Sequence, residues 1–188
     1  MNVLLSPHND DETLFAAYTI MQHDCHVVVC LRSAVELERG GPSYHEREAE
    51  TTLAIGRLGP FTWEQWTVLD NTPERYESIM EADLRNEMLK LQKRLDPERV
   101  FAPAIEAGGH WQHNLVGDLA TEVFGPERVA YYLTYVRGEG RSKGVEVVPT
   151  PRQIERKLYA LSAYRSQIEL DYTRPWFVDD PMREWRPE

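Results

Sequence analysis

The sequence predicts an α/β protein with a Rossmann-like, mainly parallel sheet, helices on both faces and a single domain spanning residues 1–188. Short apolar runs alternate along the chain with longer segments whose apolar residues recur at helical spacing, which is typical of βαβ units. A length of 188 residues is also enough to bury one hydrophobic core without disulfides or a structural metal. No repeat or linker interrupts the chain, so one domain accounts for the whole sequence.

The first part of the chain is expected to supply two strands and two helices. Residues 1–6 and 26–31 are almost wholly apolar, which favours strands buried on both faces. Between them, residues 12–21 carry apolar side chains at helical spacing. A more polar helix is expected over residues 45–57, because it follows a glycine-rich loop and ends near further glycines.

The middle of the chain is expected to supply a third strand, the longest helix and a fourth strand. The third strand is predicted over residues 66–69 and ends in Asp70. The helix opens at residues 72–74, where a proline suits the first helical turn, and continues to residue 95. The chain then returns as a strand over residues 99–102.

The last part is expected to begin with a loop that carries two histidines and to end in a tail. Its predicted elements, in order, are a loop at 108–113 leading into a helix through 123, a strand at 129–136, a charged glycine-rich loop at 137–144, a strand at 145–148 and a final helix at 150–168. Residues 174–188, rich in proline and tryptophan, are predicted to wrap the surface as a tail.

Composition excludes several classes of protein. The formal net charge of −10 and the pI near 5.1 argue against a nucleic-acid surface, which needs clustered lysine and arginine. No run approaches the ~20 apolar residues of a membrane span, and the first residues do not form a signal core, so a cytoplasmic protein is expected. Cys25 and Cys30 lie in or beside an apolar run and are expected to be reduced core thiols. The apolar edges are compatible with a homo-oligomer.

The most informative cluster is Pro7-His8-Asn9-Asp10-Asp11-Glu12, on the turn between the first strand and the first helix. His8 and Asp11 are three residues apart, so one helical turn brings both side chains to the same metal ion. Asp10 points elsewhere and is a candidate for a carboxylate that works beside the metal. The alternative is that the acidic residues only cap the helix and stabilise its dipole.

A second cluster, His110 and His113, lies in the loop after the fourth strand. In a doubly wound sheet this loop opens on the same edge as the loop that carries His8 and Asp11, so the two clusters can converge. Two histidines and one aspartate leave a fourth zinc position for water, as in hydrolytic sites. Alternatively, the two histidines are solvent-exposed or form local hydrogen bonds.

These residues resemble a known family. Residues 7–12 are similar to the PHPDDE signature of the PIG-L/LmbE-like zinc N-deacetylases, and His110-Trp111-Gln112-His113 is similar to their HPDH signature. Arg47-Glu48-Ala49-Glu50, with Ala54 and Leu58-Gly59 after it, resembles the family's RxxE, Ala and Leu-Gly pattern. Lys157 and residues 164–167 resemble its late Lys and Ser-Gln segment.

The resemblance implies a role for each matching residue. His8, Asp11 and His113 would bind one zinc ion per chain, although iron, cobalt or nickel suits the same ligands. Asp10 would be the general base, and His110 would assist protonation or stabilise the oxyanion. Arg47 would contact substrate; the alternative is a solvated helix arginine.

Three further residues are assigned from their positions. Asp70, at a strand end, is a candidate to bind a sugar hydroxyl, with a turn cap as the alternative. Trp111 lies between the two site histidines and is a candidate to stack on a sugar face. Glu12 is expected to bond backbone or to orient the ligands.

Two residues depart from the family signatures. Asn9 replaces a proline, which is expected to loosen the turn. Gln112 replaces an aspartate that could support a protonated histidine, so a lower pKa is expected for His110.

The hypothesis is therefore a metal-dependent hydrolase that removes an acetyl or acyl group from an amide nitrogen of a small substrate, such as an N-acetylglucosamine conjugate. Zinc-activated water would attack, with Asp10 as general base. Two alternatives remain. One is a phosphoesterase, for which the sequence offers no obvious second set of metal ligands. The other is a degenerate family member that acts as a binding protein.

Overall fold

A five-stranded parallel sheet forms the centre of the molecule, in the strand order β3-β2-β1-β4-β5. The computed structural model describes residues 1–32, 41–70, 77–135, 144–170, 174–178 and 182–187. Within these ranges the strands of the sheet are β1 Asn2–Ser6, β2 Cys25–Val29, β3 Trp63–Gln65, β4 Arg99–Pro103 and β5 Val129–Tyr132. The predicted α/β fold with a parallel sheet is confirmed.

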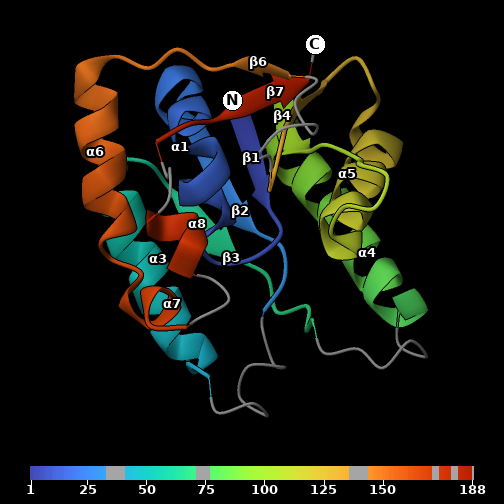
Figure 1. Cartoon of the computed structure of the whole chain (residues 1–188). Coiled ribbons are helices and arrows are strands. Elements are labelled where there is room, and N and C mark those ends of the chain that lie inside the picture. The colour runs from blue at the N-terminus through green and yellow to red at the C-terminus, as the bar shows by residue number, and fades with distance from the viewer. Residues whose placement is uncertain (33–40, 71–76, 136–143, 171–173, 179–181, 188) are drawn as a thin grey trace.

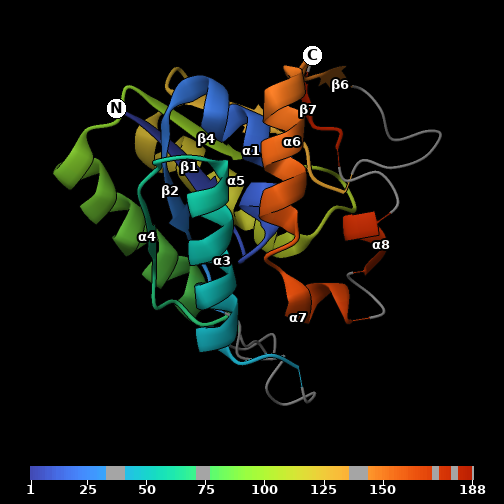
Figure 2. The same ribbon diagram turned by 90° about the vertical axis from the view of Figure 1, so that its left-hand side faces the viewer.

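Helices cover both faces of the sheet, as Figures 1 and 2 show. One face carries α1 Asp11–His23, α3 Tyr44–Leu58 and α6 Pro151–Leu161; the other carries α4 Glu77–Leu95 and α5 Trp111–Phe124. The sheet therefore separates two hydrophobic cores.

Alternation along β1 explains why the middle of the strand, Val3-Leu4-Leu5, is apolar at every position. Leu4 packs in the core beneath α1, α3 and α6, whereas Val3 and Leu5 pack in the core beneath α4 and α5. All three side chains are fully buried. The middle of a strand covered on both faces has no solvent side, so consecutive residues there are apolar.

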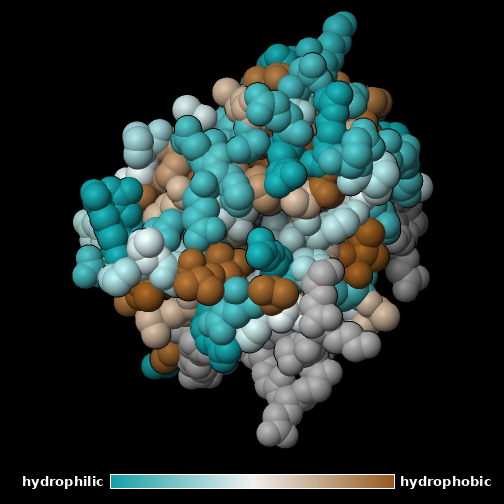
Figure 3. Space-filling view, turned by 90° about the horizontal axis from the view of Figure 1, so that it is seen from above, coloured by the Kyte–Doolittle hydropathy of each residue, from teal (hydrophilic) through white to brown (hydrophobic). Residues whose placement is uncertain are grey.

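The remaining elements lie outside the sheet. β6 Gly144–Glu146 pairs antiparallel with β7 Trp185–Pro187, and the short helices α7 Arg165–Ile168 and α8 Arg174–Val178 lie below them in Figure 1. The predicted tail, 174–188, thus contains α8 and β7. On the face seen from above, hydrophilic side chains predominate and apolar ones form separate groups (Figure 3).

The third strand lies earlier than the sequence predicted. It spans Trp63–Gln65, in register with β2, instead of residues 66–69. Trp66 and Val68 are buried against the core beneath α4 and α5, so their apolar character reflects packing and not sheet pairing. Among the residues that the structure describes, one isolated parallel bridge, between Arg32 and Leu69, continues the pairing there.

The predicted final helix, 150–168, is interrupted in the structure. Thr150 and Gln153 form a capping box that starts α6, as expected, but α6 ends at Leu161 and α7 begins at Arg165. Tyr164, in the break, turns its buried hydroxyl toward Glu12. The strand predicted over 129–136 ends at Tyr132.

Some predictions lie partly or wholly outside the described residues. The predicted start of the longest helix, 72–74, and most of the glycine-rich loop, 137–144, are among them. Within the described ranges, no helix has the length and apolar character needed to cross a membrane. Cys25 and Cys30 are buried free thiols, as predicted.

The strand order places a topological switch point between β1 and β4. From β1 the chain builds β2 and β3 on one side, then crosses to build β4 and β5 on the other. In such sheets ligands bind at the carboxyl ends of the strands where the order reverses. The loops that follow β1 and β4 carry the two predicted metal-ligand clusters.

Candidate metal centre

The turn after β1 carries the first ligands into the start of α1. Asp11 is the first residue of α1, and the carbonyl of Asp10 accepts hydrogen bonds from the N–H groups of Thr13 and Leu14. The side chain of Asp10 makes no capping bond to the helix. The alternative that this acidic turn only caps α1 therefore does not describe Asp10.

The second cluster lies at the start of α5, after β4. His110 is the N-cap residue and His113 lies in the first helical turn. Gly117 lets α5 approach β4 closely, because a Cβ there would lie 2.4 Å from the carbonyl oxygen of Pro103. This close approach directs His113 toward the end of β1.

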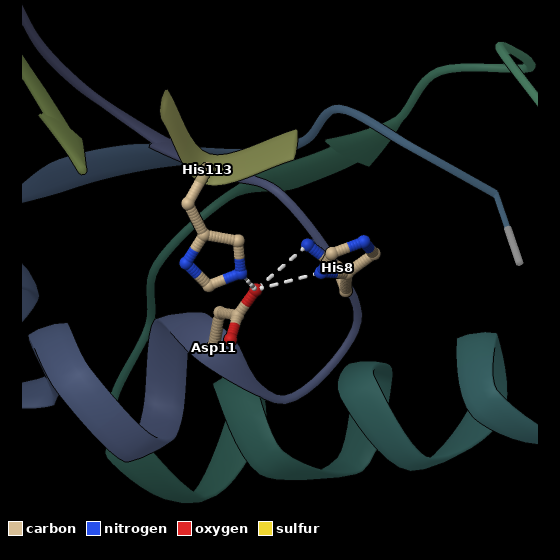
Figure 4. A group of neighbouring side chains, drawn as sticks. All are labelled: His8, Asp11 and His113. Carbon is tan, nitrogen blue, oxygen red and sulfur yellow. Dashed lines mark hydrogen bonds and ion pairs between the residues drawn. The ribbon is translucent and has the colours of Figure 1, made fainter. Parts of the chain in front are cut away.

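His8, Asp11 and His113 converge on one point (Figure 4). Oδ2 of Asp11 lies 3.1 Å from Nδ1 of His8 and 3.1 Å from Nε2 of His113. It also accepts a hydrogen bond from the backbone N–H of His8 at 3.0 Å. One ligand atom from each residue lies within 4.8 Å of the others. The predicted convergence of the two loops is confirmed.

Two neighbours hold the histidine rings in place. Nε2 of His8 lies 2.8 Å from Oε1 of Gln112, and Nδ1 of His113 lies 3.0 Å from the hydroxyl of Thr134. If each ring donates to its neighbouring oxygen, the other ring nitrogen directs its lone pair toward Asp11. Such outer contacts are typical of histidines that bind metal.

These residues fit a divalent cation. Nε2 of His113 is buried and, within the described part of the chain, has no hydrogen-bond partner despite its closeness to Asp11. Two imidazole lone pairs directed at a carboxylate repel it unless a proton or a cation lies between them. A metal ion bound by His8, Asp11 and His113 would satisfy all three groups.

The electrostatics of the ligands agree with this fit. Burial lowers the pKa of His8, but its hydrogen bond to Asp11 and the charges of Asp11 and Asp70 outweigh burial and raise it overall. Burial raises the pKa of Asp11, but the two histidines outweigh it and hold the pKa far below its usual range. Asp11 is therefore ionised at neutral pH, as a metal ligand must be.

Asp10 lies beside the metal ligands but not among them. It is buried, with a φ of 107°, and its carboxylate lies 3.5 Å from Nη2 of Arg47. Burial raises the pKa of Asp10 well above its usual range; Arg47 opposes that rise, and the charges of Asp11 and Glu12 add to it. The neighbours Asp10 and Asp11 are thus shifted in opposite directions, a pattern found where two carboxyls serve different roles.

Arg47 is held by the loop it faces. The residue is 4 % exposed, and its side chain donates a hydrogen bond of 2.5 Å to the carbonyl of Asn9. The alternative of a solvated helix arginine is therefore wrong.

The carboxylate of Glu12 stabilises the turn by accepting hydrogen bonds. Its buried carboxylate accepts from the backbone N–H of Asp10 at 3.0 Å and from the hydroxyls of Thr13 and Tyr164. Burial raises the pKa of Glu12, although the hydrogen bond from Tyr164 opposes the rise. Glu12 thus links the turn to the break between α6 and α7.

Sequence comparison identifies the family. The profile of the PIG-L family, described as GlcNAc-PI de-N-acetylase, matches residues 3–124, which include both ligand clusters. The chain belongs to the PIG-L family. Among curated protein sequences, none matches it significantly.

Solved structures share the fold of this PIG-L chain at low identity. One is a triple mutant of a deacetylase of the teicoplanin biosynthetic pathway, which is 17 % identical in sequence. The aligned region covers 96 % of this chain and 90 % of the deacetylase, with a TM-score of 0.71. Another is an N,N′-diacetylchitobiose deacetylase from Pyrococcus horikoshii, which is 22 % identical. Here the aligned region covers 93 % of this chain and 73 % of the deacetylase, with a TM-score of 0.63.

A third similar structure is that of an enzyme named for a different reaction, a hydratase. GalB, the 4-carboxy-2-hydroxymuconate hydratase from Pseudomonas putida, is 15 % identical. The aligned region covers 95 % of this chain and 83 % of GalB, with a TM-score of 0.61. These likenesses therefore establish the fold, whereas the reaction has to be argued from the site.

Both departures from the PIG-L signatures have a structural explanation. Asn9 is buried, and its side-chain amide donates to Thr51 at 2.9 Å and exchanges hydrogen bonds with the amide of Gln65. The expectation that Asn9 loosens the turn is therefore wrong, because its side chain ties the turn to α3 and β3.

Gln112 supports His8 and not His110. Its amide also donates to the carbonyl of Asp70 at 3.3 Å, which fixes the side chain. The pKa of His110 is lowered to about 4, in the predicted direction, but the causes are desolvation and the charges of His8 and His113. At neutral pH the imidazole of His110 is therefore mainly neutral.

The predicted substrate residues occupy different depths. His110 is exposed and its ring lies 4.9 Å from that of His113, centroid to centroid. Trp111 is 39 % exposed, and Asp70 is buried beside Gln112. His110 and Trp111 thus form part of the rim, and Asp70 lies deeper.

Sequence analysis missed several residues that build the site. Thr134 supports His113, the ring of Tyr135 packs against His113, and Thr51 and Gln65 hold Asn9. Thr134 and Tyr135 follow β5, at the carboxyl edge of the sheet. That position was the available signal, since side chains there face the ligand crevice.

Proposed function

We propose that the protein is a zinc-dependent N-deacetylase that hydrolyses the amide of an N-acetylglucosamine-type or related small N-acyl substrate. The observation that supports this most directly is the convergence of His8, Asp11 and His113 beside the buried carboxyl of Asp10, in a chain of the PIG-L family. Three protein ligands leave positions for water and substrate, as hydrolytic metal sites require.

His8, Asp11 and His113 would hold the metal. A divalent ion there supplies Lewis acidity toward a water molecule and toward the carbonyl oxygen of the amide. Asp10 would take the proton of the water as its oxygen attacks the carbonyl carbon. The C–N bond then breaks once the nitrogen receives a proton, from Asp10 or through His110, and acetate and the free amine leave.

Substrate would be positioned by residues around this centre. Arg47 lies next to Asp10 and would orient that carboxyl as well as contact a substrate hydroxyl or anionic group. Asp70 would accept a hydrogen bond from a sugar hydroxyl, and the exposed ring of Trp111 would stack on a sugar face. These roles suit a small polar substrate.

A phosphoesterase with two bridged metals has less support. Among the described residues, His8, Asp11 and His113 form the one group of metal-ligating side chains close enough to hold an ion. Two metal ions per chain would favour that alternative. Retained metal without hydrolysis of any N-acyl compound would favour a binding protein.

The first experiment measures bound metal and amine release together. Wild type should bind one metal ion per chain and release amine from N-acetylglucosamine or from another member of a panel of N-acyl compounds. Asp10→Asn should keep the metal and lose a large rate factor, about 10²–10⁴-fold for a general base. Unchanged turnover in Asp10→Asn would show that the base is misassigned.

A further inference from the structure

Two residues at the centre have an unusual backbone conformation. Four non-glycine residues in the described part of the chain have positive φ: Asp10, Asp24, Asp96 and Tyr135. Asp24 is the C-cap of α1 and Asp96 directly follows α4, where left-handed residues are common. Tyr135, with φ of 55°, ends no helix, and for a bulky side chain this conformation is an outlier. Surrounding packing must hold it.

The ring of Tyr135 is held between the metal centre and two other aromatic side chains. Its centroid lies 5.1 Å from that of His113 and 6.2 Å from that of His110. Phe15, at 5.0 Å, and Trp176, at 4.8 Å, meet the ring edge to face. Strained backbone that packing fixes against a functional centre is a recognised mark of preorganisation.

The hydroxyl of Tyr135 differs from those of the fully buried tyrosines. Tyr132 donates to the carbonyl of Leu5, and Tyr164 donates to Glu12. Within the described residues, the hydroxyl of the half-buried Tyr135 has no hydrogen-bond partner. A phenol is protonated at neutral pH, so this hydroxyl can donate a hydrogen bond. It is therefore an available donor on a ring that packs against His113 of the centre.

We propose that Tyr135 contacts the substrate and that its hydroxyl donates a hydrogen bond to the carbonyl oxygen of the amide bound at the His8–Asp11–His113 centre. This assignment rests on the proposed deacetylase function. A donor fixed in advance acts most strongly on the negative charge that this oxygen gains during attack. Tyr135 would therefore lower the barrier more than it would tighten substrate binding.

The test compares Tyr135→Phe with Tyr131→Phe. Both variants keep the aromatic ring, and Tyr131 lies in β5 with its hydroxyl directed to Thr121, away from the centre. Tyr135→Phe should lower kcat about 10- to 100-fold, as loss of one charge-stabilising donor does, with little change in KM. Tyr131→Phe should keep the wild-type kcat. The affinity for zinc, measured by competition with a chromogenic chelator, should be equal in all three proteins.

A second readout does not depend on turnover. Methylphosphonate is a tetrahedral anion of the shape expected after attack on an acetyl group, and its Kd for the zinc-loaded protein can be measured by calorimetry. Tyr135→Phe should raise that Kd about tenfold, since a hydrogen bond to a charged group is lost. Tyr131→Phe should leave it unchanged.

The outcomes separate this inference from the proposed function. If wild type hydrolyses an N-acyl compound and Tyr135→Phe matches it in kcat, the inference is wrong and the function stands. If wild type hydrolyses nothing, the proposed function fails, and an equal methylphosphonate Kd in the two proteins overturns the inference as well. A parallel loss of zinc affinity in Tyr135→Phe would also overturn it, because the residue would then act on the ligands.

Discussion

The two halves of the metal centre are built differently. In the turn after β1, residues 9–12 are all buried, and the side chains of Asn9, Asp10 and Glu12 are bonded to α3, β3 and the break between α6 and α7. At the start of α5, His110 and Trp111 are exposed, whereas Gln112 and His113 are buried. The first half belongs to the interior of the protein, and the second is half interior and half rim.

This difference separates two tasks. Metal geometry has to be constant, and it depends on side chains locked by packing and by hydrogen bonds. Substrate contacts can change without changing the fold, and they lie where side chains reach solvent. Apart from Asp10, which works beside the metal, residues of the buried turn should therefore affect stability or metal affinity when substituted, whereas substitutions on the rim should act on turnover and change stability little.

The largest effect is expected from removal of the buried ligand of α5. His113→Ala should abolish measurable zinc binding, because one of the three ligand groups is lost. Thr134→Val removes only the hydroxyl that supports His113, and it should weaken zinc binding about 10- to 100-fold. Both affinities can be measured by chelator competition. Equal affinity in Thr134→Val and wild type would show that Thr134 does not orient the ring.

Glu12 should be the next most sensitive position. Glu12→Ala leaves the N–H of Asp10 and the hydroxyl of Tyr164 buried without their acceptor, so the free energy of unfolding should fall by about 3 kcal/mol. Glu12→Gln keeps an acceptor oxygen and should lose less. Urea denaturation of the metal-free proteins measures both. If the two variants were equally stable, the hydrogen bonds to Glu12 would not hold the turn.

Substitutions of Asn9 test whether its side-chain hydrogen bonds hold the turn in place of the proline found in the family signature. Asn9→Ala breaks the amide pair with Gln65 and the bond to Thr51, and should cost about 1–3 kcal/mol. Gln65→Ala should cost a similar amount. The double variant should cost less than the sum, since both single variants remove the same pair. Strict additivity would mean that the two amides act independently.

The sequence was sufficient where a rule links position to fold. Apolar runs predicted four of the five sheet strands, and the shared edge of the loops after β1 and β4 predicted that His8, Asp11 and His113 converge. It was insufficient where contacts join distant segments. Nothing in the spacing indicates that Tyr164 meets Glu12, 152 residues away, or that Asn9 pairs with Gln65. Trp66 and Val68 looked like a strand because burial and strand pairing favour the same side chains.

The smallest effect is expected on the rim, from the titration of His110. Its pKa in the folded protein is about 4, below the usual value of 6.5, so the unfolded chain binds more protons between these two values. Stability should therefore fall as pH drops through this window, and it should be unaffected by His110 above it. In metal-free protein, His110→Gln should reduce the loss of stability between pH 6.5 and 4 while matching wild type at pH 7. Because the ring is exposed, solvent screening keeps this difference small. Urea denaturation of both proteins across the window measures it, and parallel curves would mean that the imidazole titrates as it does in the unfolded chain.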